Sequence, residues 1–335
     1  MVDIPNVRTS TYGLRSRTFS KMNRLVGVGI GVVLMLAILI FIKTRDQGIY
    51  TYTTFKMEKL NPLRYTPGFN QSKQKDIDLY RYLKSPNPYR QVPNADKKFS
   101  QAHQDEVVYE ILPKEGGFYI EMGAYNGMDL SNTLWLERKH KWTGLLIEAN
   151  PALCAQIDKV RRSAWRLCAC ISTEKTVTFI PGNALGGVKD TIDSDHMKTV
   201  RNRKEMTVPC FTLGRVLDAI NVHKIDFYSL DVEGAEMFIL GTIKKQLISE
   251  EIIVGVWAIE YRVYDGHKNI YPKSKENLAK LRQYFKEVGH YVEHSQLDQF
   301  PRSKVIPDGH SLDVVFVNIK IWCETHEVLP DGNKC

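Results

Sequence analysis

Short apolar runs alternate with amphipathic stretches along most of the chain after residue 100. A continuous apolar run of about four to eight residues is typical of a buried strand, and apolar positions three or four apart are typical of a helix. Strands are predicted at 118–121, 144–148, 166–171, 177–180, 226–230, 252–258, 290–293 and 313–318, and helices at 130–139, 152–161, 212–220, 235–247 and 275–288. This order predicts one α/β domain with a mostly parallel sheet and helices on both faces. The polar segment 181–209 is expected to be a lid or substrate loop.

One apolar stretch near the N-terminus is too long for a strand. Residues 25–42 read LVGVGIGVVLMLAILIFI, 18 positions without a charge. As a helix they would extend about 27 Å, close to the hydrocarbon thickness of a bilayer. A buried helix of a soluble protein rarely stays apolar on every face. We therefore predict a cytosolic basic tail at 1–24, an uncleaved transmembrane signal anchor at 25–42, a proline-rich linker at 43–100 and a folded domain at 101–335.

The basic character of the chain belongs to its N-terminal third. The 335 residues include 46 Lys and Arg against 38 Asp and Glu. Residues 1–43 hold six basic residues and one acidic, 45–100 hold 11 and 5, and 101–335 hold 29 and 32. A broadly basic face for nucleic acid is therefore not expected on the domain. Because the basic excess precedes the predicted span, the positive-inside rule predicts a type II membrane protein whose C-terminal domain is luminal.

The cysteines agree with a luminal domain. All six follow the predicted span, at Cys154, Cys168, Cys170, Cys210, Cys323 and Cys335. Asn70-Gln71-Ser72 is a glycosylation acceptor in the linker. Six cysteines allow 15 pairings, and the sequence suggests only that Cys323 and Cys335 close a short loop. No zinc site is predicted, because Cys168 and Cys170 lack the usual two-residue gap and no histidine pair follows.

The candidate chemistry lies at the ends of predicted strands. The strand 118–121 runs directly into a turn, EMGAYNG, in which Gly123 and Gly127 let the backbone approach a ligand. The spacing differs from GxGxxG, and no basic residue is present to meet a pyrophosphate, so a nucleoside without phosphates fits better. The next strand ends at Glu148, whose carboxylate can accept two hydrogen bonds from ribose hydroxyls.

These segments resemble a known family. The carrying motifs are FYIEMGAYNG at 118–127, SNTL at 131–134, TGLLIEANP at 143–151 and IDFYSLDVEGAE at 225–236. They are similar to motifs of the FkbM-type S-adenosylmethionine-dependent methyltransferases, and the resemblance covers about residues 105–320. The predicted anchor and the SNTL segment look most like the animal membrane-anchored branch that contains the Star protein. The resemblance implies a single Rossmann-like class I methyltransferase domain behind the transmembrane helix.

The resemblance also implies roles for particular residues. It places Glu121, Gly123 and Gly127 around the methionine part of S-adenosylmethionine and Glu148 on its ribose, with Ala124 and Asn150 also among the cofactor-binding residues. Asp231 ends a strand beside the methyl group, and Asp231, Glu233 or a nearby histidine could take a proton from a hydroxyl acceptor.

Each of these residues also has a structural interpretation. Asp231, Glu233 and Glu236 precede a predicted helix, where carboxylates bind free backbone N–H groups. Glu148 lies before Asn150-Pro151 and could belong to a turn, and Gly123 and Gly127 could serve only a tight turn.

Two functions therefore remain open. One is transfer of a methyl group from S-adenosylmethionine to a hydroxyl of a glycan or small metabolite, in the lumen of the endoplasmic reticulum or Golgi. The other is a non-catalytic, Star-like adaptor that escorts membrane-anchored growth-factor precursors from the endoplasmic reticulum to the Golgi or endosomes. Both would be membrane-anchored in the secretory pathway, and neither involves nucleic acid. Fold alone does not separate them, because function lies in the site.

Overall fold

A computed structural model describes residues 79–182, 184–263, 269–298 and 311–335 of the chain. The predicted membrane span at 25–42, the glycosylation acceptor and the first part of the predicted linker lie outside these residues. Within the described ranges, no helix combines the length and the apolar character that crossing a bilayer requires.

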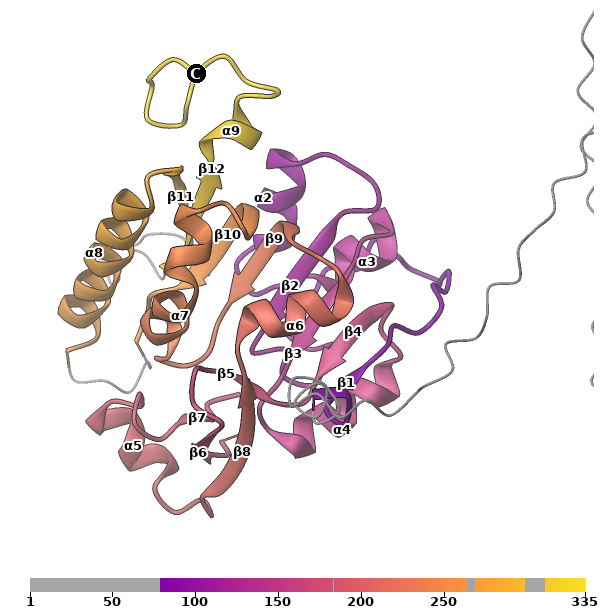
Figure 1. The fold of residues 1–335 in the computed structure, drawn as a ribbon, viewed down its shortest axis with the longest axis vertical. Helices are drawn as coiled ribbons and strands as arrows, with labels where there is room; N and C mark the ends of the chain where they lie inside the picture. The colour runs from indigo at the N-terminus through magenta and orange to yellow at the C-terminus, as the bar shows by residue number, and fades with distance from the viewer. Residues whose placement is uncertain (1–78, 183, 264–268, 299–310) are drawn as a thin grey trace, which may run out of the picture. The chain divides into compact units, whose positions relative to one another are not determined.

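The centre of the fold is a mixed eight-stranded sheet in the order β1-β4-β3-β2-β9-β10-β12-β11 (Figure 1). The strands are β1 (Leu83–Lys84), β2 (Phe118–Met122), β3 (Thr143–Ile147), β4 (Ala164–Leu167), β9 (Lys224–Leu230), β10 (Ile253–Glu260), β11 (Tyr291–Asp298) and β12 (Ser311–Asn318). The five strands from β4 to β10 are parallel, and the pairs at the two edges are antiparallel. The prediction of a mostly parallel sheet thus holds for its centre.

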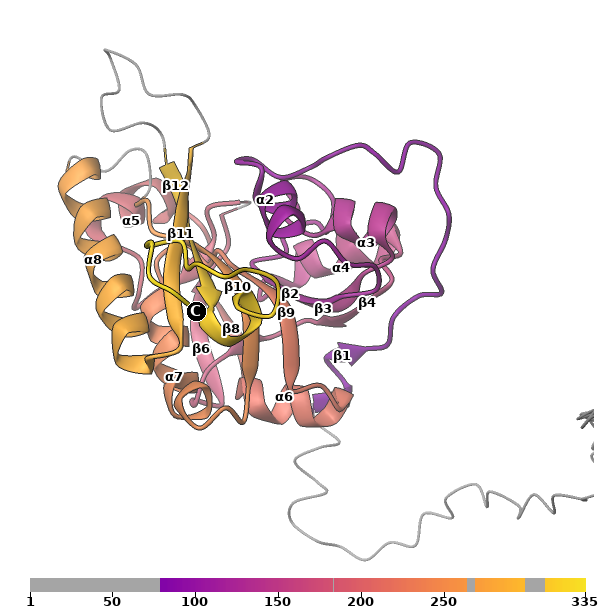
Figure 2. The same cartoon turned by 90° about the horizontal axis from the view of Figure 1, so that it is seen from above.

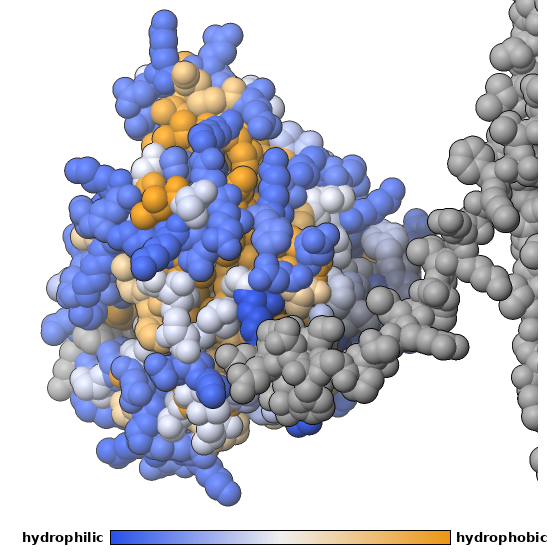
Figure 3. Space-filling view, viewed as in Figure 1, coloured by the Kyte–Doolittle hydropathy of each residue, from blue (hydrophilic) through white to orange (hydrophobic). Residues whose placement is uncertain are grey.

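Helices cover both faces of this sheet (Figure 2). One face packs against α2 (Gln104–Ile111), α3 (Leu134–His140) and α4 (Pro151–Val160), and the other against α6 (Leu213–Ile220), α7 (Glu236–Ile248) and α8 (Ile270–Val288). Alternate strand residues point to opposite faces: Tyr119 packs with the first group and Ile120 with the second. The short helix α9 (Ile319–Trp322) follows β12. In Figure 3 the viewed surface is mostly hydrophilic, and apolar side chains show between the helices.

The folded unit begins earlier than the predicted boundary at residue 101. Strand β1 pairs with β4, where Leu83 lies opposite Leu167. Leu79 and Leu83 are buried in the core, with exposed fractions of 0% and 5%. Two leucines in the segment predicted as linker therefore belong to the hydrophobic core.

The predicted loop at 181–209 is partly regular structure. A second, four-stranded sheet has the order β5-β8-β6-β7 and consists of β5 (Cys170–Ile171), β6 (Thr176–Ile180), β7 (Gly187–Val188) and β8 (Met206–Phe211). Between β7 and β8 lies helix α5 (Ser194–Val200), where the Asp193 side chain accepts hydrogen bonds from the backbone N–H groups of Asp195 and His196. The single strand predicted at 166–171 is two strands, because β4 joins the main sheet and β5 the second one.

All six cysteines form disulfides, pairing Cys154 with Cys168, Cys170 with Cys210, and Cys323 with Cys335. The last pair confirms the short loop that the sequence suggested. The first two pairs hold the segment between β4 and β5, one bond tying it to α4 and the other to β8.

Candidate active site

A pocket of about 340 Å³ opens at the carboxyl ends of the central parallel strands. Its lining includes the residues that follow β2, β3, β9 and β10, which are neighbours in the sheet. The second sheet and its disulfide contribute another wall, through Cys170, Phe179 and Val188. This is the edge at which open α/β sheets bind ligands.

The turn after β2 is fixed between the two neighbouring strands. The N–H groups of Gly123 and Ala124 both donate to the carbonyl oxygen of Ile147, at 3.0 and 3.1 Å, and the Asp231 N–H donates to the Met122 carbonyl at 3.1 Å. Gly123 has φ +86°, and a β-carbon there would overlap the carbonyl oxygen of Asp231. Only glycine fits this position, so the bare backbone of Gly123 forms part of the pocket wall, next to Ala124.

Glu148 lies at the end of β3 with its side chain in the pocket wall. One carboxylate oxygen accepts from the Tyr125 N–H at 2.9 Å, and the other from the Asn150 N–H at 2.7 Å. Each oxygen has a second lone pair, so the group can still accept two hydrogen bonds from a ligand. Burial of this side chain, which is 6% exposed, raises the pKa of Glu148 to about 7. The residue serves the turn and faces the pocket at once, so the two interpretations of Glu148 are compatible.

The Glu121 carboxylate uses most of its hydrogen-bond acceptor capacity within the protein. Its carboxylate accepts from the Ser131 hydroxyl at 2.9 Å, the Asn132 N–H at 2.8 Å and the Thr133 hydroxyl at 2.5 Å, and the Arg162 guanidinium lies 3.7 Å away. Burial raises the pKa of Glu121. These bonds hold 131–133 as a turn, which explains why α3 begins at Leu134 rather than at the predicted residue 130.

Two predicted cofactor residues lie behind the pocket wall. Gly127 is absent from the lining; its carbonyl accepts from Arg162 at 2.7 Å, and its α-carbon packs closely against Ile157. Asn150 caps α4, because its side-chain oxygen accepts from the Ala152 N–H at 3.0 Å. Both residues support the wall, and the structure does not bring either into the pocket.

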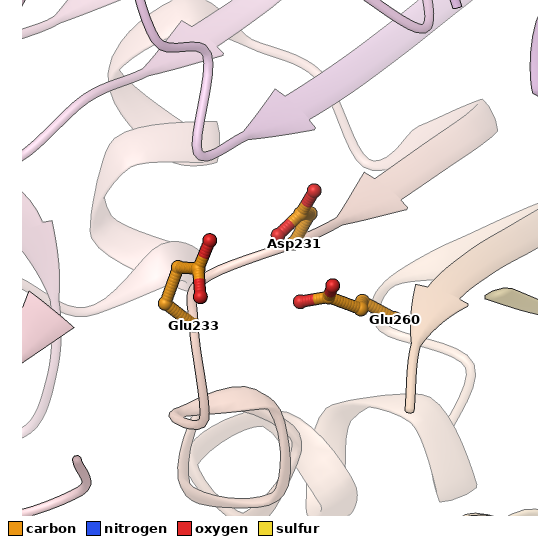
Figure 4. Close-up of side chains that lie close together, drawn as sticks. All are labelled: Asp231, Glu233 and Glu260. Atoms are coloured by element: carbon orange, nitrogen blue, oxygen red, sulfur yellow. The ribbon is translucent and has the colours of Figure 1, made fainter. Parts of the chain in front are cut away.

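Three carboxylates meet beside this turn (Figure 4). Asp231 follows β9, Glu233 lies two residues later in a left-handed conformation with φ +56°, and Glu260 ends β10. Each offers an oxygen within 4.8 Å of the others, and all three line the pocket. We call these three residues the acidic cluster. Glu260 was not predicted, because it ends an ordinary apolar strand and no motif marks it.

Burial and mutual repulsion favour retention of a proton in the acidic cluster. Burial raises the pKa of Asp231, and a hydrogen bond joins its carboxyl group to that of Glu260. Burial and the nearby charges of Asp231, Glu233 and Glu236 raise the pKa of Glu260 well above its usual range. Two carboxyl groups share a hydrogen bond only if one is protonated, and the raised pKa of Glu260 favours the proton there. Oxygens at this spacing also suit a divalent cation.

Of the three acidic residues considered as caps, only Glu236 shows a structural role, and it serves the turn before α7 rather than capping the helix. Glu236, the first residue of α7, accepts from the N–H groups of Val232 and Gly234 at 3.0 and 3.2 Å. Asp231 and Glu233 line the pocket instead.

Several solved structures resemble the fold. An FkbM methyltransferase from Methylobacillus flagellatus KT has 14% identity and a TM-score of 0.38 over 71% of this chain and 49% of its own, so this chain spans about half of that protein. A putative rRNA methylase from Clostridium thermocellum has 10% identity and a TM-score of 0.36, covering 67% of this chain and 97% of its own. A TehB-like S-adenosylmethionine-dependent methyltransferase from Corynebacterium glutamicum has 10% identity and a TM-score of 0.35, covering 74% and 96%.

No curated protein sequence matches the chain. The family model of the methyltransferase FkbM domain matches residues 121–292, more than half of the chain. That range begins at the last part of β2 and ends in β11, and it includes Gly123, Glu148 and the whole acidic cluster. The chain belongs to the FkbM methyltransferase domain family.

Proposed function

We propose that the pocket binds S-adenosylmethionine and that the domain transfers its methyl group to a hydroxyl of a glycan or small metabolite. The carrying observation is that Glu148 presents two oxygens with spare acceptor capacity to a pocket whose next wall is the bare backbone of Gly123. A ribose offers two neighbouring hydroxyl donors, which match such a carboxylate. The Cβ-free turn leaves room for the cofactor's remaining groups, so the residues present fit the cofactor.

The residues of the chain would divide the work as follows. Glu148 would hold the ribose, and the turn at Gly123 and Ala124 would lie against the methionine part. When bound, S-adenosylmethionine supplies a methyl group on a positively charged sulfonium. The ionised Asp231 and its neighbour Glu233 favour positive charge beside them, and Asp231 is placed to accept the proton of an acceptor hydroxyl.

We further propose that this domain works in the lumen of the endoplasmic reticulum or Golgi, as a type II protein anchored through residues 25–42 and related to the Star branch. Three disulfides in the folded unit support an oxidising compartment. The charge asymmetry around residues 25–42 supports the orientation.

Calorimetric titration tests the cofactor directly. The compact unit comprises residues 66–335, and we would titrate S-adenosylmethionine and S-adenosylhomocysteine into it after folding under oxidising conditions. Micromolar binding that weakens at least tenfold in Glu148→Gln is expected, with Glu276→Gln, an exposed carboxylate on α8, as the matched control. A folded domain that gives no heat and no thermal shift would refute the cofactor and favour the cargo-adaptor function.

A further inference from the structure

Apolar side chains from four separate segments line the same pocket as the acidic cluster. Leu130 precedes α3, Leu185 precedes β7, Phe238 lies in α7, and Val263 follows β10. Leu130 and Phe238 are 44% and 42% exposed, and Leu185 and Val263 are half-buried, so these groups lie where the pocket meets solvent. We call these four residues the apolar rim.

Leu130 occupies its place against two local preferences. Its φ is +62°, in the left-handed region that side chains bearing a β-carbon rarely adopt, and its large apolar side chain faces water. Asparagine would suit both the backbone and the solvent better. The conformation is maintained because the following residues, Ser131 to Thr133, are bound to Glu121. Strain retained at a pocket mouth is typical of a functional position.

Phe238 is also unnecessary to the core. It lies two residues into α7, and the next residue, Ile239, supplies the buried contact of that turn. The Phe238 ring is exposed. Glu236, at the start of the same helix, lies next to the acidic cluster. An exposed aromatic ring therefore lies within one helical turn of Glu236.

The volume of the pocket indicates that a methyl acceptor would bind next to the apolar rim. A volume of about 340 Å³ is near the lower end for small-molecule sites. A nucleoside cofactor held at Glu148 and Gly123 would take up most of that space. An acceptor approaching the acidic cluster would then lie at the mouth, where Leu130 and Phe238 are exposed.

Resting on the proposed function, we infer that the methyl acceptor carries an apolar group, an aromatic ring or alkyl chain beside its hydroxyl, and that this group packs on Leu130 and Phe238. A hydroxyl by itself gains nothing from two exposed hydrophobic side chains, so the acceptor needs apolar surface beside that hydroxyl. An acceptor with an apolar neighbour removes their surface from water as it binds. The apolar rim then selects the substrate and the acidic cluster takes its proton.

The test uses 2-naphthol, an aromatic ring that carries one hydroxyl, as the probe. The probe would be titrated into the 66–335 unit saturated with S-adenosylhomocysteine, and the change in its fluorescence would report binding. Saturable binding is expected for the wild type, and Leu130→Asn and Phe238→Ser should each raise the Kd at least fivefold. Leu130→Asn suits the left-handed backbone, so unfolding would not explain its loss of affinity.

A matched control lies on the same helix as Phe238. Ile248, at the end of α7, is 47% exposed and does not line the pocket, so Ile248→Ser should leave the Kd for 2-naphthol unchanged. Absence of saturable binding, an unchanged Kd in both rim variants, or an equal loss in Ile248→Ser would overturn the inference. The affinity for S-adenosylhomocysteine, measured separately in each variant, should not change. If the wild type does not bind S-adenosylhomocysteine, that result counts against the proposed cofactor and not against the apolar rim.

Discussion

The carbonyl oxygen of Asp231 occupies the space that a β-carbon on Gly123 would need. Gly123→Ala must therefore displace either the turn after β2 or the segment after β9, and it must also hold alanine at a positive φ. We expect a loss of about 3 kcal/mol in the free energy of unfolding and loss of S-adenosylhomocysteine binding. Gly214→Ala is the control, because a β-carbon there meets nothing within 4 Å and α6 favours alanine by up to about 1 kcal/mol. The free energies of unfolding of both variants, measured with a denaturant, check this prediction.

Glu148 should make cofactor binding depend on pH. Ribose hydroxyls donate to the ionised carboxylate, and burial raises the pKa of Glu148 to about 7. The affinity for S-adenosylhomocysteine should rise about tenfold from pH 6 to pH 8, because one proton must leave before binding. Glu148→Gln should lose this rise, although Glu236, whose pKa burial also raises to about 7, is present in both proteins. An equal pH dependence in both proteins would assign the proton to another group.

Glutamine is the milder substitution at this position, because its amide oxygen keeps one of the two backbone N–H donors, although its NH2 group cannot accept from the other. Glu148→Ala would leave the N–H groups of Tyr125 and Asn150 without their acceptors. Each buried donor left unpaired costs about 1–3 kcal/mol, so loss of binding in that variant would mix with loss of folding.

Glu260→Gln should stabilise the protein at high pH. The pKa of Glu260 is raised in the folded state, so the folded chain keeps a proton that the unfolded chain releases as pH rises above its ordinary pKa. The contribution of this group to stability therefore falls as pH rises. Glutamine does not titrate and can still donate to Asp231. The gain in unfolding free energy over wild type should increase by at least about 1.4 kcal/mol from pH 5 to pH 8.

Glu276→Gln provides the contrast in sign. Lys280 and Lys273 lower the pKa of Glu276 to about 2, so its charge is favoured in the folded state. Thermal unfolding at pH 8 should show no gain for this variant. A gain of the same size in both variants would mean that the effect is general to the protein's negative charge.

The disulfide Cys170–Cys210 should matter for the pocket, and Cys323–Cys335 should not. In the chain-entropy model, loss of Cys170–Cys210, 40 residues apart, costs about 4 kcal/mol, and loss of Cys323–Cys335, 12 apart, costs about 3 kcal/mol. Cys170 lines the pocket, whereas Cys323 and Cys335 do not. Paired serine substitutions at 170 and 210 should weaken S-adenosylhomocysteine binding. The pair at 323 and 335 should lower the melting temperature with unchanged affinity at 20 °C.

Leu79 tests where the folded unit begins. Leu79→Ala removes a fully buried side chain and should cost about 2–4 kcal/mol, whereas the adjacent Tyr80 is 55% exposed and Tyr80→Ala should cost little. Chemical denaturation of the 66–335 unit measures both. Equal free energies of unfolding for the two variants would mean that this segment belongs to the linker and not to the folded unit.

Much of the central sheet follows from local sequence pattern. The apolar strands β2, β3 and β9 are buried on both faces, and for such strands a continuous apolar run is a sufficient signal. The parallel arrangement then brings Gly123, Glu148 and Asp231 to one edge, as the strand order predicts. Strand β1 is only two residues long, and its neighbours are polar, so no period reveals it.

The rest of the site depends on contacts that the pattern does not encode. Glu260 joins Asp231 because β10 pairs with β9 in parallel, a fact of register rather than of composition. The wall at Phe179 and Val188 depends on pairing between β6, which was predicted as a strand, and β7, whose two residues lie in a segment too polar to be predicted as sheet. Gly127 and Asn150 lie in matching motifs, but their turns direct them behind the wall.

The place of β12 in the sheet affects how the protein can be made. Strand β12 follows the other described strands of this sheet in the chain and inserts between β10 and β11, where its Asp313 pairs with Glu260 of the acidic cluster. Until residue 318 has emerged, the apolar edge of β10 has no partner on that side. A prematurely terminated chain would expose that edge to other chains, a route to aggregation. A nascent chain would thus complete the sheet beside the acidic cluster only after β12 has been made, and any product that ends before β12 lacks this pairing.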